Sequence, residues 1–130
     1  MPWLKKSGLK PWAQRPKPPE NRWTDEEAQR FYNSPAWRNC RKAYMHAHPL
    51  CEISLGNGRH VAGKECDHII PVRFGGAQFH EGNLMSMSIY YHRRKSAFER
   101  NGNRILVGFV ETEWGLIPKN KDEIIQVLRN

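Results

Sequence analysis

The part of the sequence that decides the fold lies between residues 65 and 95. It consists of four short stretches, in the order ECDHIIP (65–71), GG (75–76), NL (83–84) and HRRK (92–95). Hydrolysis of a phosphodiester needs a group that takes a proton from water, and a divalent ion that neutralises charge on the phosphate. Histidine suits the first task because its unperturbed pKa is about 6.5. A carboxylate and an imidazole together can hold the ion, so these stretches contain candidates for both tasks.

Asp67 and His68 are consecutive residues of an expected strand. Their side chains should therefore point to opposite faces of it, and they cannot bind one ion together without a bend. This geometry favours a division of roles between the two, provided that a following helix returns His92 to the side of Asp67.

The segments around these residues predict the order strand, strand, loop, helix. Residues 59–64 and 66–72 have the composition of two short strands with a turn at 63–65 between them. Gly75 and Gly76 open a polar loop. Apolar residues at helical spacing predict a helix over about 87–100.

Helices are expected on both sides of this core. The pair Thr24 and Glu27 has the spacing of a capping box, which predicts a helix to about residue 32. The pair Ser34 and Pro35 predicts the start of a second helix, to about residue 46. Further elements are a strand over 105–111 and a helix over 122–128. We therefore expect a small single domain of the α+β class.

The length and charge of the chain indicate its domain organisation and the kind of partner that it binds. Its 130 residues are enough for one domain, and 21 Lys and Arg against 13 Asp and Glu give a net charge of +8. Residues 1–22 carry six of these basic residues, one Glu and five of the nine prolines. Like charges and proline predict a flexible basic arm at 1–22 before a domain at 23–130, although an unstructured remnant would have the same composition. A basic chain favours a polyanion as partner, nucleic acid before membrane.

Several classes of protein are excluded. No apolar run is long enough to span a bilayer, and no apolar stretch follows the first lysines as in a secretory signal. The three cysteines, Cys40, Cys51 and Cys66, are an odd and widely spaced set. They predict free thiols in a reducing compartment, hence a cytoplasmic protein. Glycine-rich phosphate loops are absent from the sequence.

The ordered set of stretches resembles the HNH endonucleases, also called ββα-metal nucleases, and among them the small phage-encoded type. The resemblance covers about residues 31–100 and includes SPAWR (34–38) and HPLC (48–51). His68, Asn83 and His92 are separated by 15 and 9 residues, as the family pattern requires. The resemblance implies a ββα-metal core over about 58–100. This core consists of a two-stranded hairpin, a loop and a helix, and further helices flank it.

The resemblance also implies roles for these residues. Asp67 and His92 would hold one Mg²⁺ or Mn²⁺, His68 would be the general base, and Asn83 would brace the loop and help to set the His68 side chain. The expected substrate is double-stranded DNA, nicked by a monomer or cleaved by a homodimer with weak sequence preference. A phage-encoded protein would act in the host cytoplasm, either in DNA packaging with a terminase or portal protein or in restriction-like cleavage. The basic residues expected to contact DNA are Arg59, Arg73, Arg93, Arg94 and Lys95.

Each of the site residues also has a simpler structural role when it is taken singly. His68 is then a structural histidine, Asn83 a helix cap and His92 a solvated helix residue. The alternative function is a non-catalytic DNA-binding or assembly accessory that keeps the fold. A protein that coats nucleic acid is a third, for which only Trp3 and Trp12 of the arm supply stacking aromatics.

The sequence departs from the family at its structural zinc. Many members hold this zinc with two CxxC pairs, whose positions here are Cys51 with Ser54 and Ser88 with Tyr91. One thiolate with hydroxyls does not hold tetrahedral zinc, so no structural zinc is expected. Apolar packing should replace it, through Met87, Tyr91 and Phe98.

Overall fold

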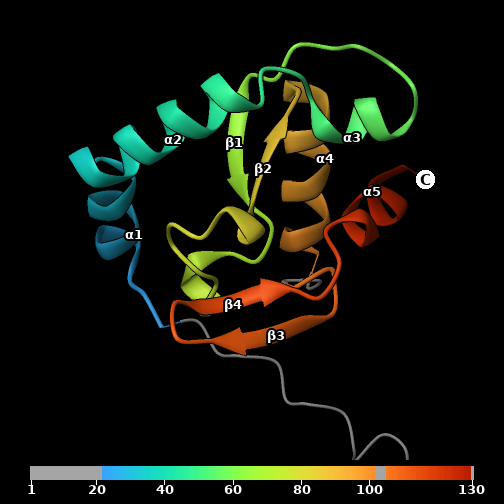
Figure 1. Cartoon of the computed structure of the whole chain (residues 1–130). Helices are drawn as coiled ribbons and strands as arrows, with labels where there is room; N and C mark the ends of the chain where they lie inside the picture. Colours follow the sequence, from blue (N-terminus) through green and yellow to red (C-terminus); the bar gives the residue numbers. More distant parts are fainter. Residues whose placement is uncertain (1–21, 102–104, 130) are drawn as a thin grey trace, which may run out of the picture.

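The centre of the fold is an antiparallel sheet of two strands, β1 (Glu65–His68) and β2 (Leu84–Met87), followed directly by helix α4 (Ile89–Arg100) (Figure 1). The structure is a computed structural model and describes residues 22–101 and 105–129. In the sheet Asp67 is paired with Met85 and His68 with Leu84. The connection between the strands contains two short 3₁₀ turns, η2 (Val72–Phe74) and η3 (Glu81–Asn83).

The expected strand positions were wrong. Residues 59–64 do not form a strand, and β1 ends at His68 instead of continuing to residue 72. Pro71 cannot donate to a strand ladder, and the peptide of Ile70 is hydrogen-bonded to the Asn83 side chain instead. Strand β2 was not predicted because all four of its residues are buried, so its sequence lacks the alternation of apolar and polar residues that identifies a strand.

The helices agree more closely with expectation. In α1 (Asp25–Tyr32) both hydrogen bonds of the Thr24–Glu27 capping box are present, and the Ser34 hydroxyl caps α2 (Pro35–Ala47). Helix α4 begins two residues later than expected, where the Ser88 hydroxyl accepts from the Tyr91 N–H. These ends were predictable because a cap involves only residues within one turn.

The remaining elements complete a small single domain of the α+β class. Helix α3 (Glu52–Gly56) follows α2, and a second antiparallel sheet pairs β3 (Phe109–Thr112) with β4 (Gly115–Pro118) before α5 (Asp122–Arg129). The expected strand at 105–111 is thus shorter and displaced, and β4 was not expected. Residues 1–21 of the expected basic arm lie outside the described residues, and the Arg22 N–H donates to the Arg73 carbonyl at 2.8 Å.

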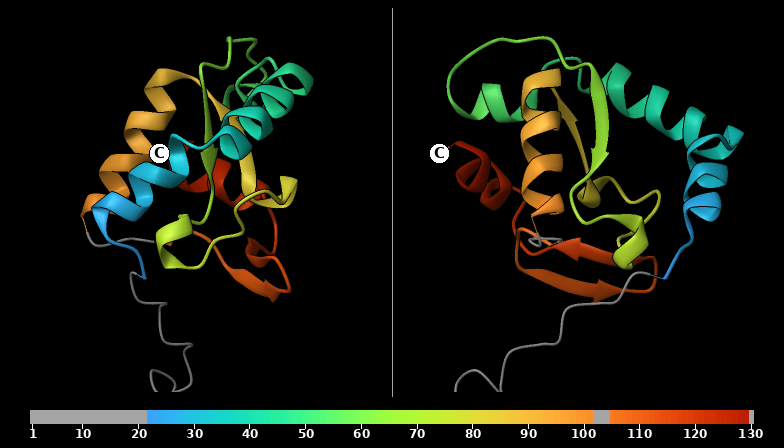
Figure 2. Two further views of the ribbon diagram at one scale, coloured as in Figure 1. Left: turned by 90° about the vertical axis from the view of Figure 1, so that its left-hand side faces the viewer. Right: turned by 180° about the vertical axis from the view of Figure 1, so that it is seen from behind.

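The sheet β1–β2 lies between α2 and α4, with the β3–β4 hairpin beyond the loop end of the strands (Figures 1 and 2). A small cluster packs the sheet against α2 through Trp37, Tyr44, Cys66 and Leu84. A larger cluster joins the loop, α3, α5 and β4, and its fully buried members include Ile53, Ile69, Ile70, Met87, Ile124 and Leu128. The two clusters thus pack on opposite faces of the sheet, with Leu84 of β2 in the small cluster and Met85 and Met87 of β2 in the larger one.

The positions that correspond to the family zinc site lie together in this core. The Cys51 thiol is fully buried and accepts a hydrogen bond from the Ser54 N–H at 3.4 Å. Burial raises the pKa of this thiol, but hydrogen bonds from Ser54 and Ser88 outweigh it, so the pKa lies below its usual value. Tyr91 and Phe98 pack against the same cluster, so apolar side chains and a hydrogen-bonded thiol fill this region.

Candidate active site

Strand β1 presents its two chemically important side chains to opposite faces. The Asp67 carboxylate faces α4, where its Oδ2 lies 2.9 Å from Nζ of Lys95. The His68 ring faces α2, where it lies 4.5 Å from the ring of Trp37. This is the arrangement that the period of two in a strand predicts.

Lys95 is the cation that compensates the carboxylate. It is 1% exposed, and its Nζ also donates to Oε2 of Glu99 at 2.5 Å and to the His68 carbonyl at 3.0 Å. The structure therefore places Lys95 inside the protein and not on the surface, where the expected contact with DNA would need it. A buried ammonium requires charged partners, and two carboxylates supply them here.

The charges of this group shift one another. Burial raises the pKa of the Asp67 carboxyl, but Lys95 and, more weakly, His92 outweigh it and hold that pKa below its usual range. Burial and the Asp67 charge raise the pKa of Glu99 to about 7, against the opposing effect of Lys95. Burial lowers the pKa of Lys95, but the two carboxylates outweigh it and raise the pKa above its usual value. Asp67 is thus kept ionised at neutral pH.

His68 combines a fixed ring with one unused nitrogen. Its Nε2 lies 2.9 Å from the carbonyl oxygen of Gln78, and within the described residues its buried Nδ1 has no hydrogen-bond partner. When Nε2 carries the hydrogen and donates it to Gln78, Nδ1 keeps a lone pair that can accept a proton. Burial lowers the pKa of His68 below its ordinary value, so the ring is neutral at pH 7.

Aromatic side chains from α1 cover the His68 ring, which is 1% exposed as a residue. The rings of Phe31 and Tyr32 lie 5.8 Å and 5.9 Å from it. Burial and the charges of Asp67 and Glu99 raise the pKa of Tyr32 above its usual range. Tyr32 therefore contacts His68 and senses the charge of Asp67, and neither Tyr32 nor Gln78 was expected in the site. No motif in the sequence identifies them, because both reach the site through tertiary contacts.

Asn83 is completely buried and holds the loop after β1 in shape. Its Oδ1 accepts from the Ile70 N–H at 2.8 Å, and its Nδ2 donates to the carbonyls of Ile70 and Ala77 at 2.9 Å and 3.0 Å. A Cβ atom at Gly76 would collide with the carbonyl oxygen of Ile70, so only glycine fits there. Asn83 thus fixes the loop that carries Gln78, and the His68 ring is bonded to Gln78 and not to Asn83.

The carboxylate of Asp67 and the imidazole of His92 are the donors expected to hold a divalent ion, and Oδ2 of Asp67 already lies 2.9 Å from the Lys95 ammonium. His92 lies one turn before Lys95 on α4, and its charge contributes to the lowered pKa of Asp67 after the larger effects of burial and Lys95. Within the described residues, three or more His, Cys, Asp or Glu side chains do not come together as a metal site. Carboxylate oxygens accept more than one partner, so Asp67 can bind an ion besides Lys95. Mg²⁺ keeps several waters when protein ligands are few, which suits a site of one carboxylate and one imidazole.

The other residues expected to contact DNA differ in exposure. Arg59 and Arg93 are exposed. Arg73 forms an ion pair with Asp25 at 2.5 Å, and Nε of Arg94 donates to the Leu128 carbonyl at 2.7 Å. Arg73 and Arg94 are therefore held by contacts within the protein. None of the helices in residues 22–101 and 105–129 is long and apolar enough to cross a bilayer.

Comparison with known proteins adds one structural relative. No family model and no curated protein matches the chain. The structure is similar to the crystal structure of the HNH endonuclease of the deep-sea thermophilic bacteriophage GVE2 with manganese ion, with a TM-score of 0.57 and 26% sequence identity. The match covers 61% of this chain and 88% of that chain. The order β1, loop, β2, α4, with Asp67 and His68 at the end of β1, is therefore an HNH-like fold.

Proposed function

We propose that this chain is a metal-dependent endonuclease that hydrolyses phosphodiester bonds of DNA. The observation that carries the proposal is the His68 ring, whose Nε2 is bonded to Gln78 and whose buried Nδ1 has no partner in the described residues, on the strand that also carries the ionised Asp67. The similarity to a phage HNH endonuclease supports the same reaction class. A neutral imidazole of lowered pKa is suited to take a proton from water at neutral pH.

Each residue of the site has a distinct role in this proposal. His68 is the general base, and Asp67 and His92 would hold one Mg²⁺ or Mn²⁺. The bound ion supplies charge neutralisation at the scissile phosphate and the leaving oxygen. Lys95 keeps Asp67 ionised and oriented. Asn83 acts at a distance, because it fixes the loop whose Gln78 carbonyl sets the tautomer of His68.

The covering of His68 has a consequence for the substrate. His68 is 1% exposed, so water reaches Nδ1 only after the aromatic side chains around the ring move. Tyr32 is the last residue of α1 and is 40% exposed, and an outward turn of its ring would break its contacts with Phe31, Trp37 and His68. We propose that the phosphate enters at the edge of β1 that Tyr32 covers, where Asp67 and His68 are both within reach.

The finer features of the function extend the same proposal. Arg59 and Arg93 would contact phosphates of double-stranded DNA, which gives affinity without sequence preference. One site cleaves one strand, so a monomer would nick and a homodimer would break both strands. A phage-encoded protein of this kind would act in the host cytoplasm, in DNA packaging with a terminase or portal protein.

The proposal is tested by nicking of supercoiled plasmid. The intact chain should convert supercoiled into open circular DNA with Mg²⁺ or Mn²⁺, and a chelator should stop the reaction. His68→Ala should reduce the rate by about 10²- to 10⁴-fold, the usual contribution of a general base. The matched control is His60→Ala, an exposed histidine outside the site, which should keep the full rate. Equal activity of the two variants would contradict the role of His68.

The second candidate function is a DNA-binding or assembly accessory without turnover. The burial of His68 and the 2.9 Å ion pair between Asp67 and Lys95 favour it, because both oppose access of substrate and ion. The same assay separates the two. Plasmid binding by the folded chain without nicking under any divalent ion would favour the accessory.

A further inference from the structure

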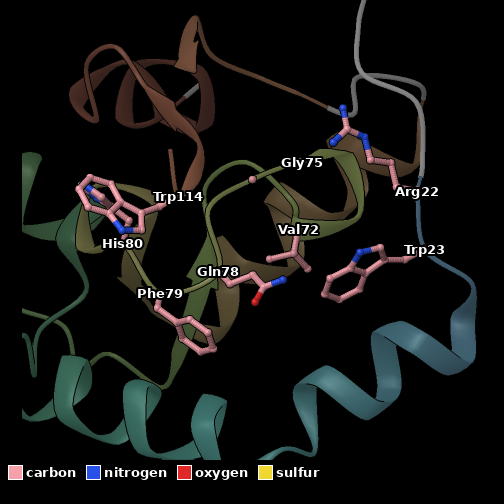
Figure 3. A pocket seen from close by; sticks show the side chains of 9 residues that line it. Arg22, Trp23, Val72, Gly75, Gln78, Phe79, His80 and Trp114 are labelled. Carbon is pink, nitrogen blue, oxygen red and sulfur yellow. The ribbon is translucent and has the colours of Figure 1, made fainter. Parts of the chain in front are cut away.

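A pocket of about 650 Å³ lies beside the loop that joins β1 and β2 (Figure 3). We call it the aromatic pocket, and its main lining residues are Arg22, Trp23, Gln78, Phe79, His80 and Trp114. None of the residues to which we assign catalysis or metal binding lines it. Its volume is within the range of about 300–1,000 Å³ that is usual for small-molecule sites.

The aromatic pocket adjoins the proposed active site through one residue. The carbonyl oxygen of Gln78 lies 2.9 Å from Nε2 of His68, while the rest of Gln78 lines the pocket. The ring of Phe79 lies 5.7 Å from that of Phe31, which in turn lies 5.8 Å from the His68 ring. An occupant of the pocket would therefore sit next to a phosphate at His68.

The lining has the chemistry that recognises a nucleobase. Phe79 is 48% exposed and Trp114 is 63% exposed, and flat rings of this kind stack on bases. Figure 3 shows the carboxamide of Gln78 between the rings of Phe79 and Trp23. An amide both donates and accepts, so it can pair with the edge of a base.

The charge of the pocket also favours a nucleic acid. Arg22 lines it, and no carboxylate is among its described lining residues. The whole chain carries a net charge of +8. A base within a continuous duplex is stacked between its neighbours and cannot enter, so the occupant must be unpaired.

We propose that the aromatic pocket binds one unpaired nucleobase beside the scissile phosphate. The preferred substrate is then double-stranded DNA that carries unpaired nucleotides, as at gaps and junctions, over uninterrupted duplex. This inference rests on the proposed nuclease function for its biological meaning, but base binding by the pocket can be measured without catalysis.

The test compares two fluorescein-labelled oligothymidylates of equal length by fluorescence anisotropy, with a chelator present so that neither is cleaved. One is intact, and the other is abasic at every position, which removes all bases and keeps every phosphate. The intact chain should bind the intact oligonucleotide about 5- to 140-fold more tightly than the abasic one, the contribution of one stacked base.

Three variants locate this preference. Trp114→Ala and the pair Phe79→Ala with Trp114→Ala should bring the ratio of the two affinities toward one, while circular dichroism stays that of the folded chain. These side chains are about half exposed, so their loss costs little stability. The control is Tyr90→Ala, an aromatic on α4 that is 65% exposed and lies outside the aromatic pocket. It should keep the ratio of the intact chain.

The proposal is overturned if the intact chain binds both oligonucleotides equally, or if Tyr90→Ala lowers the ratio as much as Trp114→Ala. Failure of the nuclease function is a separate result. If the chain discriminates bases but never nicks plasmid, base binding by the aromatic pocket is supported and the nuclease function is contradicted. If the chain nicks plasmid without base discrimination, the nuclease function is supported and base binding by the pocket is contradicted.

Discussion

Replacement of Lys95 by methionine tests the electrostatics of the site most directly. Methionine has a similar length and no charge, so Lys95→Met keeps most of the packing and removes the ammonium. The ammonium contacts Asp67 at 2.9 Å, Glu99 at 2.5 Å and the His68 carbonyl at 3.0 Å, and Lys95 is 1% exposed. Removal of one partner from a buried ion pair costs about 3–5 kcal/mol of unfolding free energy. We expect a loss in this range.

The pH dependence of the loss follows from Glu99. Its pKa is already raised to about 7, and without Lys95 it should rise further. A carboxyl with a raised pKa binds more protons in the folded state than in the unfolded state, so its contribution to stability falls as pH rises. The deficit of Lys95→Met should therefore be larger at about pH 8 than at about pH 6. Adding Glu99→Gln should recover part of it, because only the Asp67 carboxylate then lacks its cation.

Urea denaturation followed by tryptophan fluorescence measures these differences, and the m-value checks that unfolding remains cooperative. The matched control is Arg93→Met, which removes an exposed charge from the same helix and should change stability by about 0.5 kcal/mol or less. If Lys95→Met lies within about 1 kcal/mol of the intact chain at both pH values, the ion-pair network does not stabilise the fold and the reasoning fails.

Three further outcomes are expected. Asn83→Ala should lower the unfolding free energy by at least about 3 kcal/mol in urea, because it leaves buried groups of Ile70 and Ala77 without partners; a loss below about 1 kcal/mol would contradict the bracing role. Since burial lowers the pKa of His68, cleavage should have reached its plateau by about pH 7 and fall below about pH 6.5 as the ring is protonated. A rate that still rises tenfold between about pH 7 and about pH 8 would exclude His68 as the titrating base. Elemental analysis of protein purified without chelator should find far less than one zinc per chain, because Cys51 is the one thiol at the four family positions; about one tightly bound zinc would refute this.

Sequence alone was sufficient where short-range rules apply. The caps of α1 and α2 lie within one turn of the residues that they serve, so Thr24 and Ser34 mark the helix starts correctly. The division of Asp67 and His68 between opposite faces follows from the geometry of any strand. The α+β class follows from the order of such local signals along the chain.

The partners of these residues were decided only by tertiary structure. Strand β2 could not be recognised because burial on both faces removes its alternation, and it pairs with β1 across residues 69–83. The sequence places Lys95 in a run of basic residues, which predicts a surface cation. In the fold it is buried, because Asp67 and Glu99 both form ion pairs with it. Gln78 and Tyr32 reach His68 from a loop and from a separate helix. Contacts of this kind depend on which distant segments pack against each other, and a short stretch of sequence does not indicate which segments those are.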